Sequence, residues 1–182
     1  NGGPKPTPSL HRSTVRSVRA AREIEVSLAK ISRAGGSAKY HVCDLNDEGA
    51  VGSVVRGIGR VDALVHASGV LRDKLIENQK EDDFHAVYGT KVEGLETLLG
   101  ALNADELKYV GLFSSLAGTY GNISQSPYAA ANAVLARVSS WLSFAHDVRS
   151  NAMCFGPWWD SSGKGMVTPA LTSLVPSLSL SL

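Results

Sequence analysis

The chain has 182 residues, of which 43% are hydrophobic, and its 18 basic residues nearly balance 17 acidic ones for a formal net charge of +1. This length suits one domain with an ordinary globular core. Both signs of charge are dispersed and no apolar run is long enough to cross a bilayer, so we expect no nucleic acid and no membrane span among its interactions.

Residues 1–13 are rich in Pro and Gly and predict an irregular linker. They contain no Met and no apolar signal core, so they resemble a linker or an internal cut from a longer chain rather than a secretory signal. Cys43 and Cys154 end apolar runs and lack metal-binding spacing, so we expect buried free thiols in a reducing compartment. This favours a cytoplasmic location, with an organelle as the alternative.

From residue 14 to 174 the sequence predicts one domain, followed by a tail at 175–182. The expected elements are a helix that ends at Gly35-Gly36, strand 38–43, helix 47–58, strand 61–67, helix 81–102, strand 109–113, helix 127–145 and strand 149–155. Strands that alternate with helices at these lengths predict βαβ units and a parallel sheet. The strand at 61–67 is mostly apolar and alternates little, which is typical of a strand covered on both faces.

The stretch from 109 to 132 predicts a site at the edge of that sheet. Its apolar strand leads into Ser114 and Ser115, a loop rich in Gly, Asn and Ser follows, and a helix starts at Pro127-Tyr128. Tyr128 and Asn132 are four residues apart and share one helix face. Because ligands of open α/β sheets bind beyond the carboxyl ends of the strands, a hydroxyl and a phenol are expected there together.

Lys91 falls on the apolar line of the helix at 81–102, between Val87 and Leu95. A lysine on a buried stripe is unusual unless it is paired or functional. The alternative is a stem that reaches along the apolar surface to solvent.

Five segments, in this order and spacing, carry a family resemblance: His66-Ala-Ser-Gly-Val-Leu-Arg-Asp73, Lys91-Val-Glu-Gly94, Phe113-Ser-Ser-Leu-Ala-Gly118, Tyr128-Ala-Ala-Ala-Asn132 and Gly156-Pro-Trp158. Together they resemble the short-chain dehydrogenase/reductase superfamily, in the ketoreductase form of polyketide and polyunsaturated fatty acid synthases. The resemblance covers roughly residues 38–170. It implies an α/β fold with a Rossmann-like parallel sheet and flanking helices.

The resemblance also implies catalytic roles. Tyr128 would be the general acid that protonates the substrate carbonyl, Ser115 would hydrogen-bond the same oxygen, and Lys91 would stand near Tyr128 and the nicotinamide ribose. Asn132 would order the proton relay. Many relatives place the Lys four residues after the Tyr and the Asn on the earlier helix, whereas this chain has the exchanged arrangement of synthase ketoreductases. Ser114 competes with Ser115, and family spacing selects Ser115.

NADPH is the cofactor that the family implies. Its expected contacts are Asp44 and Leu45 at the adenine, Ala67, Ser68 and Gly69 along the dinucleotide, and Gly156, Pro157 and Thr168 at the nicotinamide. A loop-capping role for Asp44 is an equal alternative, and His66 is expected to be a packed histidine rather than a base. The sequence has no Gly-x-Gly-x-x-Gly loop between an N-terminal strand and helix, so we expect an N-terminally truncated domain.

The truncation leaves two arrangements open. Either the strand at 38–43 pairs with the strand at 61–67 in a contracted sheet of about four strands, or an exposed sheet edge remains.

The function implied is NADPH-dependent reduction of a 3-ketoacyl thioester on an acyl carrier protein with a phosphopantetheine-bound chain, beside neighbouring synthase domains. Leu71-Arg72-Asp73 favours a 3R product. One alternative is a catalytically inactive, truncated or structural fragment. Another is a short-chain reductase for a free small ketone, which the exchange of Lys and Asn disfavours.

Overall fold

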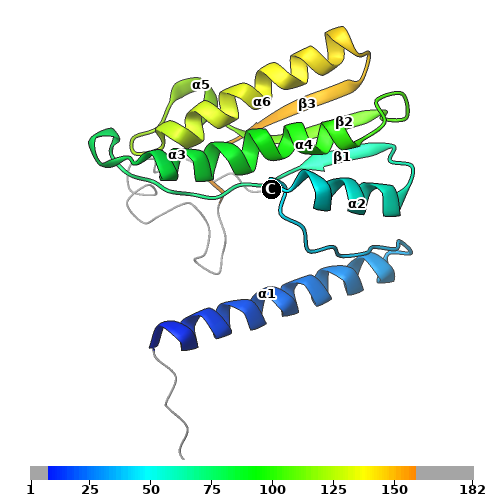
Figure 1. Cartoon of the computed structure of the whole chain (residues 1–182), viewed down its shortest axis with the longest axis horizontal. Helices are drawn as coiled ribbons and strands as arrows, with labels where there is room; N and C mark the ends of the chain where they lie inside the picture. Colours follow the sequence, from blue (N-terminus) through cyan, green and yellow to red (C-terminus); the bar gives the residue numbers. More distant parts are fainter. Residues whose placement is uncertain (1–7, 159–182) are drawn as a thin grey trace, which may run out of the picture. The chain divides into compact units, whose positions relative to one another are not determined.

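The computed structural model describes residues 8–158, which belong to two compact units, residues 1–42 and residues 43–182. In the first unit, helix α1 spans Pro8–Arg33, and the chain leaves it through Gly35 with a positive φ of 84° (Figure 1). The helix therefore begins before residue 14, inside the segment expected to be irregular. Residues 38–43 form no strand, which contradicts our prediction. A strand needs a partner for its backbone hydrogen bonds, and no described strand supplies one.

The second unit holds all the described strands. Its elements are α2 (Glu48–Ile58), β1 (Ala63–His66), η1 (Ile76–Asn78), α3 (Glu81–Tyr88), η2 (Gly89–Glu93), α4 (Gly94–Ala101), β2 (Tyr109–Ser115), α5 (Ala117–Tyr120), α6 (Ser126–Ala145) and β3 (Arg149–Phe155). The strands form a parallel sheet in the order β1-β2-β3, in which His66 pairs with Leu112 and Ser115 with Phe155. The predicted parallel sheet with flanking helices is confirmed for a partial domain.

Helices α4 and α6 pack over one face of this sheet (Figure 1). The core between them is made of apolar side chains from both layers: Leu95, Leu107, Val110, Leu112, Leu135, Leu142 and Val148. On β1, Leu64 and His66 face this layer, whereas Val65 on the opposite face is 60% exposed. The prediction that this strand is covered on both faces is therefore wrong for the described residues. The apolar composition of β1 would suit a second layer on the Val65 face, and the described part of this unit provides no such layer.

Strand β1 pairs only with β2 among the described strands, so its outer edge is open. Of the two arrangements considered, the exposed edge is found and the four-stranded sheet is not. The two cysteines lie outside the core. Cys154 lies on β3 at the other edge of the sheet and is exposed, and Cys43 lies outside any helix or strand and is half-buried. Both are free, as predicted, but neither is buried.

Local signals set the helix ends where the sequence predicted them. Asp47 caps α2 by accepting a hydrogen bond from the Ala50 N–H at 2.9 Å, and Gly59 ends the helix with a positive φ of 80°. Pro127 lies in the first turn of α6, where its missing N–H costs no helical hydrogen bond. The predicted helix at 81–102 is a continuous helical run, but its middle, η2, is π-helical.

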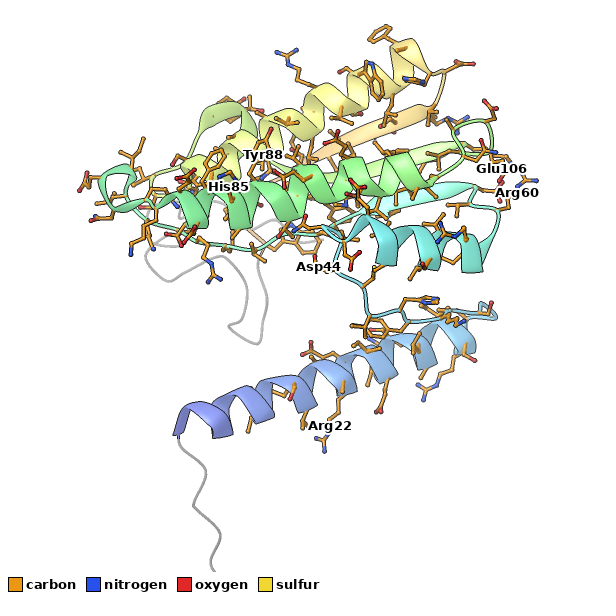
Figure 2. All side chains as sticks on the ribbon, viewed as in Figure 1. Arg22, Asp44, Arg60, His85, Tyr88 and Glu106 are labelled. Carbon is orange, nitrogen blue, oxygen red and sulfur yellow. The ribbon has the colours of Figure 1, made fainter. Side chains whose placement is uncertain are left out.

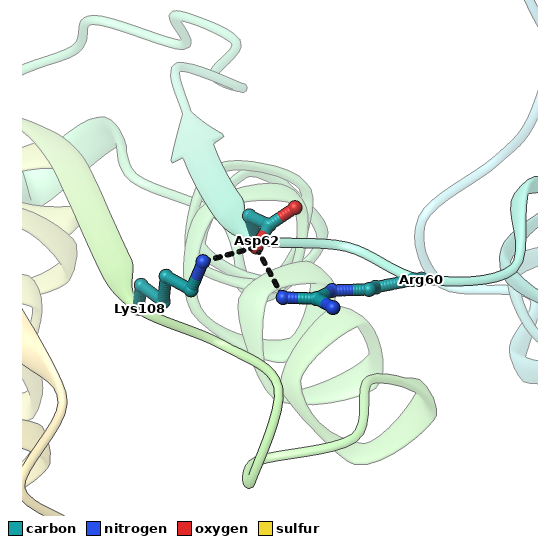
Figure 3. Close-up of polar contacts among 3 residues, drawn as sticks. All are labelled: Arg60, Asp62 and Lys108. Carbon is teal, nitrogen blue, oxygen red and sulfur yellow. Dashed lines mark hydrogen bonds and ion pairs between the residues drawn. The ribbon is translucent and has the colours of Figure 1, made fainter.

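The amino ends of β1 and β2 are joined by Asp62 (Figure 3). Its carboxylate accepts hydrogen bonds from Lys108 at 2.8 Å and Arg60 at 2.9 Å, and these bonds hold the pKa of Asp62 below its usual range. The resulting stabilisation is present above the unfolded-state pKa and is lost as the pH falls through the lowered folded pKa. Because Asp62 is solvent-exposed, this contribution is small. Arg60 and Glu106, at this end of the sheet, lie far from Tyr88 and His85 on α3 (Figure 2).

Two glycines offer a matched pair of stability predictions. A Cβ on Gly118 of α5 would lie 2.9 Å from the backbone N of Ala133 and 2.9 Å from the backbone C of Asn132, whereas a Cβ on Gly100 of α4 would meet nothing within 4 Å. We expect Gly118→Ala to lower the free energy of unfolding by roughly 1–3 kcal/mol through overpacking. Gly100→Ala should raise it by about 0.5–1 kcal/mol through lower backbone entropy of the unfolded chain. Urea unfolding of both variants measures this, and equal effects would contradict the close packing of α5 on α6.

Candidate active site

Lys91 is a buried cation of the second unit, with only 4% of its surface exposed. Its Nζ donates to the backbone oxygen of Phe113 on β2 at 3.0 Å and to that of Ser68 after β1 at 3.2 Å. Nζ also lies 5.8 Å from the centroid of the Tyr128 ring. The alternative of a stem that reaches solvent is thus excluded, and burial lowers the pKa of the ammonium.

The π-helical segment η2 presents this lysine to the strand ends. The Gly94 N–H bonds to the Gly89 oxygen, a five-residue step that an α-helix does not make. Single π turns within α-helices occur frequently at functional sites. This backbone feature carries Lys91, and the apolar periodicity of the sequence gave no sign of it.

Tyr128 and Asn132 lie one turn apart at the start of α6, as their spacing predicts. Tyr128 is half-buried, while Asn132 is 0% exposed and so is no surface amide. The Asn132 Nδ2 donates to the Tyr128 backbone oxygen at 2.8 Å. Its Oδ1 has no hydrogen-bond partner among the described residues, which leaves one buried acceptor open for a water or a ligand group.

Ser114 and Ser115 end β2 in different environments. Ser114 is buried, and its Oγ donates to the Asn132 backbone oxygen at 3.1 Å. Ser115 is half-buried, and its Oγ accepts from the Ala117 N–H at 3.2 Å. Within the described residues the Ser115 hydroxyl donates to no acceptor, so its proton is available to a substrate. This geometry favours Ser115 over Ser114 as the substrate-binding hydroxyl.

The other predicted residues follow the carboxyl ends of the strands or lie beside α4. Ser68 and Gly69 follow β1, and Gly156 and Pro157 follow β3, where a Cβ on Gly156 would lie 3.7 Å from Leu116 Cδ1. These ends meet because the strands are parallel and adjacent. Ala67 is exposed at the same end of β1. Thr168 lies outside the described residues.

Asp44 and Leu45 precede α2 (Figure 2). Leu45 packs against Gly94, where an added Cβ would lie 2.9 Å from the Leu45 Cβ. The Asp44 side chain accepts from the Asn46 N–H at 3.0 Å, so it does cap its own loop, but this bond uses only one carboxylate oxygen. A cofactor-binding role for Asp44 and Leu45 stays a prediction.

The residues fit one end of a dinucleotide better than the other. Beside Lys91 the Gly69 backbone comes close to the ammonium, because a Cβ added to Gly69 would lie 3.7 Å from Nζ, in ordinary van der Waals contact. The Lys91 ammonium and the unpartnered Asn132 Oδ1 are polar groups that suit a ribose hydroxyl or an ordered water, and a nicotinamide near Tyr128 stays a prediction. A pyrophosphate normally rests on a glycine-rich turn at a helix N-terminus, and no strand of the described part leads into such a turn.

Gln125 is a buried residue beside the site that no sequence pattern singled out. Its Nε2 donates to Asp73 Oδ2 at 2.8 Å, and its Oε1 accepts from Asn122 Nδ2 at 2.8 Å. The Lys74 N–H also donates to the Ser124 oxygen at 2.9 Å. These bonds tie the Leu71-Arg72-Asp73 loop to the segment before Tyr128. Gln125 stands three residues before the tyrosine, but no local pattern marks a loop glutamine as buried.

The profile of the KR domain family matches residues 12–160. The chain belongs to the KR (ketoreductase) domain family. It is 49% identical over 174 residues to a polyunsaturated fatty acid synthase polypeptide of Thraustochytrium sp., covering 93% of this chain and 6% of that protein. It is 34% identical over 115 residues to highly-reducing polyketide synthase 1 of Aureobasidium melanogenum, covering 62% of this chain and 5% of that protein.

Solved structures agree with this assignment. This KR domain superposes on an N-terminal ketoreductase from the macrolactin assembly line with a TM-score of 0.70 at 24% identity, covering 75% of this chain and 29% of that one. For the ketoreductase from the first module of phoslactomycin biosynthesis in a Streptomyces, the TM-score is 0.68 at 28% identity, covering 78% and 33%. The described residues contain no helix long and apolar enough to cross a membrane, and no cluster of three His, Cys, Asp or Glu that could bind a metal.

Proposed function

We propose that this KR domain reduces the 3-keto group of an acyl thioester to the 3-hydroxyl, with NADPH as reductant, inside a polyketide or polyunsaturated fatty acid synthase. The observation that carries the proposal is the buried Lys91 ammonium, which two strand-end carbonyls hold beside the Tyr128 ring. A lysine so thoroughly desolvated needs a compensating role. Stabilising negative charge on a phenol at the carboxyl ends of a parallel sheet is such a role.

In this mechanism the residues of the chain donate one proton to the substrate oxygen and stabilise the negative charge that develops on it. The Ser115 hydroxyl donates a hydrogen bond to the substrate carbonyl oxygen, and the Tyr128 hydroxyl gives its proton to the same oxygen. The Lys91 ammonium stabilises the phenolate that remains. Asn132 anchors the first turn of α6 through Tyr128 and offers its open Oδ1 to an ordered water. Donors aimed at a developing oxyanion are often the largest single contribution to catalysis.

NADPH, when bound, supplies the hydride to the carbonyl carbon. Ser68 and Gly69 after β1, together with Gly156 and Pro157 after β3, would border its nicotinamide end. Asp44 and Leu45 would border the adenine. These assignments rest on the family pattern and on the position of these residues after the carboxyl ends of β1 and β3 and before α2.

The proposed substrate is carried by the phosphopantetheine of an acyl carrier protein, and neighbouring synthase domains are the proposed partners. The synthases among the relatives support this, because this chain spans 6% or less of the lengths of those reported above. The two free cysteines support a reducing compartment, the cytoplasm or the interior of an organelle.

The test is NADPH oxidation with a 3-ketoacyl thioester, measured on a polypeptide that joins this chain to an N-terminal strand-loop-helix segment. We expect turnover of the thioester, little turnover of a free small ketone, and mainly 3R product by chiral analysis. The hydrogen bond from Gln125 to Asp73 supports the stereochemical expectation, because it holds the Leu-Arg-Asp loop against the segment that precedes Tyr128. Absence of any thioester reduction would contradict the proposal.

A second candidate, a structural fragment without catalysis, is favoured by two observations. None of the described strands pairs with the outer edge of β1, and the described residues contain no pyrophosphate-binding turn. Failure of the joined polypeptide to oxidise NADPH, although Ser115, Tyr128, Lys91 and Asn132 keep their folded arrangement, would support this alternative.

A further inference from the structure

His66, the last residue of β1, is buried like the core side chains of the second unit. It is 1% exposed, and its Nε2 lies 2.8 Å from the backbone oxygen of Lys91 in η2. A carbonyl oxygen can only accept, so Nε2 carries the proton in this bond. The other ring nitrogen, Nδ1, has no hydrogen-bond partner within the described residues. The ring is therefore a neutral donor with one fixed tautomer.

The surroundings keep the ring neutral. Burial is the main cause that lowers the pKa of His66, and the nearby Lys91 charge acts in the same direction, while the hydrogen bond to the Lys91 oxygen opposes both. Among the described residues, Lys91 on η2 is the charged group that acts on the ring, and the residue paired with His66 on β2 is the apolar Leu112. A second proton on the ring would be a buried donor without an acceptor.

The hydrogen bond from His66 means that Lys91 is held both at its backbone and at its ammonium group. Its backbone oxygen is held by the side chain of His66, and its ammonium is held by the backbone oxygens of Ser68 and Phe113. Two of these three partners, His66 and Ser68, lie two residues apart at the end of β1. Hydrogen bonds to residues of β1, β2 and the segment after β1 thus hold both the backbone and the ammonium of Lys91, and the ammonium lies beside the Tyr128 ring.

We propose that His66 is a positioning residue that acts through Lys91, because its Nε2–H holds the π-helical backbone of η2 at the end of β1 and so fixes where the ammonium stands. This proposal rests on the reductase function proposed above. It goes beyond the sequence-based expectation of a packed histidine, because packing alone requires neither this tautomer nor this partner.

Two variants separate the hydrogen bond from the packing. His66→Phe keeps a ring but removes the donor, and His66→Gln keeps an amide N–H that can reach the same carbonyl. Val148→Ala, a core change whose side chain belongs to the cluster between the sheet and α6, controls for lost stability. The first readout is solvent exchange of the Lys91 Nζ protons by NMR in the whole 182-residue chain. We expect protection in wild type, His66→Gln and Val148→Ala, and fast exchange in His66→Phe.

The second readout is steady-state kinetics in the joined polypeptide. We expect His66→Phe to lower kcat about tenfold with little change in KM, and His66→Gln to restore most of it. Lys91→Ala and the double variant His66→Phe/Lys91→Ala should have equal kcat, because His66 acts only through the lysine.

The two readouts fail in distinguishable ways. Additive losses in the double variant, or unchanged Nζ exchange in a folded His66→Phe variant, would overturn the positioning role. If wild type reduces no thioester, the proposed function fails, and the exchange of the Nζ protons still decides whether His66 fixes Lys91.

Discussion

Replacing Tyr128 by Phe is expected to lower kcat for thioester reduction by about 10²–10⁴-fold, the usual range for loss of a general acid. The change removes the phenolic proton donor that lies beside the Lys91 ammonium. KM should change little, because the donated bond matters chiefly in the transition state. The assay is NADPH oxidation by the joined polypeptide over a range of substrate concentrations.

The structure offers a matched control in Tyr120, which is 81% exposed at the end of α5. Tyr120→Phe removes the same hydroxyl from the surface and should leave kcat and the fold unchanged. Circular dichroism should show that Tyr128→Phe is folded, since its ring and its backbone bond with Asn132 remain. Retention of most of the wild-type turnover by Tyr128→Phe would reject its assignment as the acid.

The parts of the site that could be predicted are those with a local sequence signal. Lys91 interrupts an apolar stripe, and the structure buries it there. The spacing of Tyr128 and Asn132 places both on one turn of α6. The two ends of helix α2, at Asp47 and Gly59, follow from capping interactions, which act over a few residues.

The features that could not be predicted depend on partners far away in the chain. Residues 38–43 have the composition of a strand, but composition cannot say whether a neighbouring strand is present to pair with them. The apolar composition of β1 likewise predicts that Val65 is buried. Val65 is exposed because the described part of its unit covers only the other face of β1. The π-helical turn at Lys91 and the burial of Gln125 likewise depend on tertiary contacts rather than on periodicity.

The largest binding effect that we expect concerns NADPH. The isolated 182-residue chain should bind it weakly, with a dissociation constant in the millimolar range, on the order of a thousandfold weaker than a micromolar site. The residues proposed to border the nicotinamide and ribose are among those described, but the described residues provide no glycine-rich turn for the negatively charged pyrophosphate. The open edge of β1 is where a further parallel strand can pair and bring such a turn to the carboxyl end of the sheet.

The measurement is titration with NADPH followed by its fluorescence, for the chain alone and for the chain joined to an N-terminal strand-loop-helix segment. Joining the segment should lower the dissociation constant to the micromolar range. A matched control carries the same segment with its loop glycines replaced by Val, which keeps the strand but blocks the backbone approach to the phosphates. If the control binds as tightly as the joined chain, the strand alone restores the site. If the isolated chain already binds at micromolar concentration, its phosphate site is built without a glycine-rich turn, and the truncation argument is wrong.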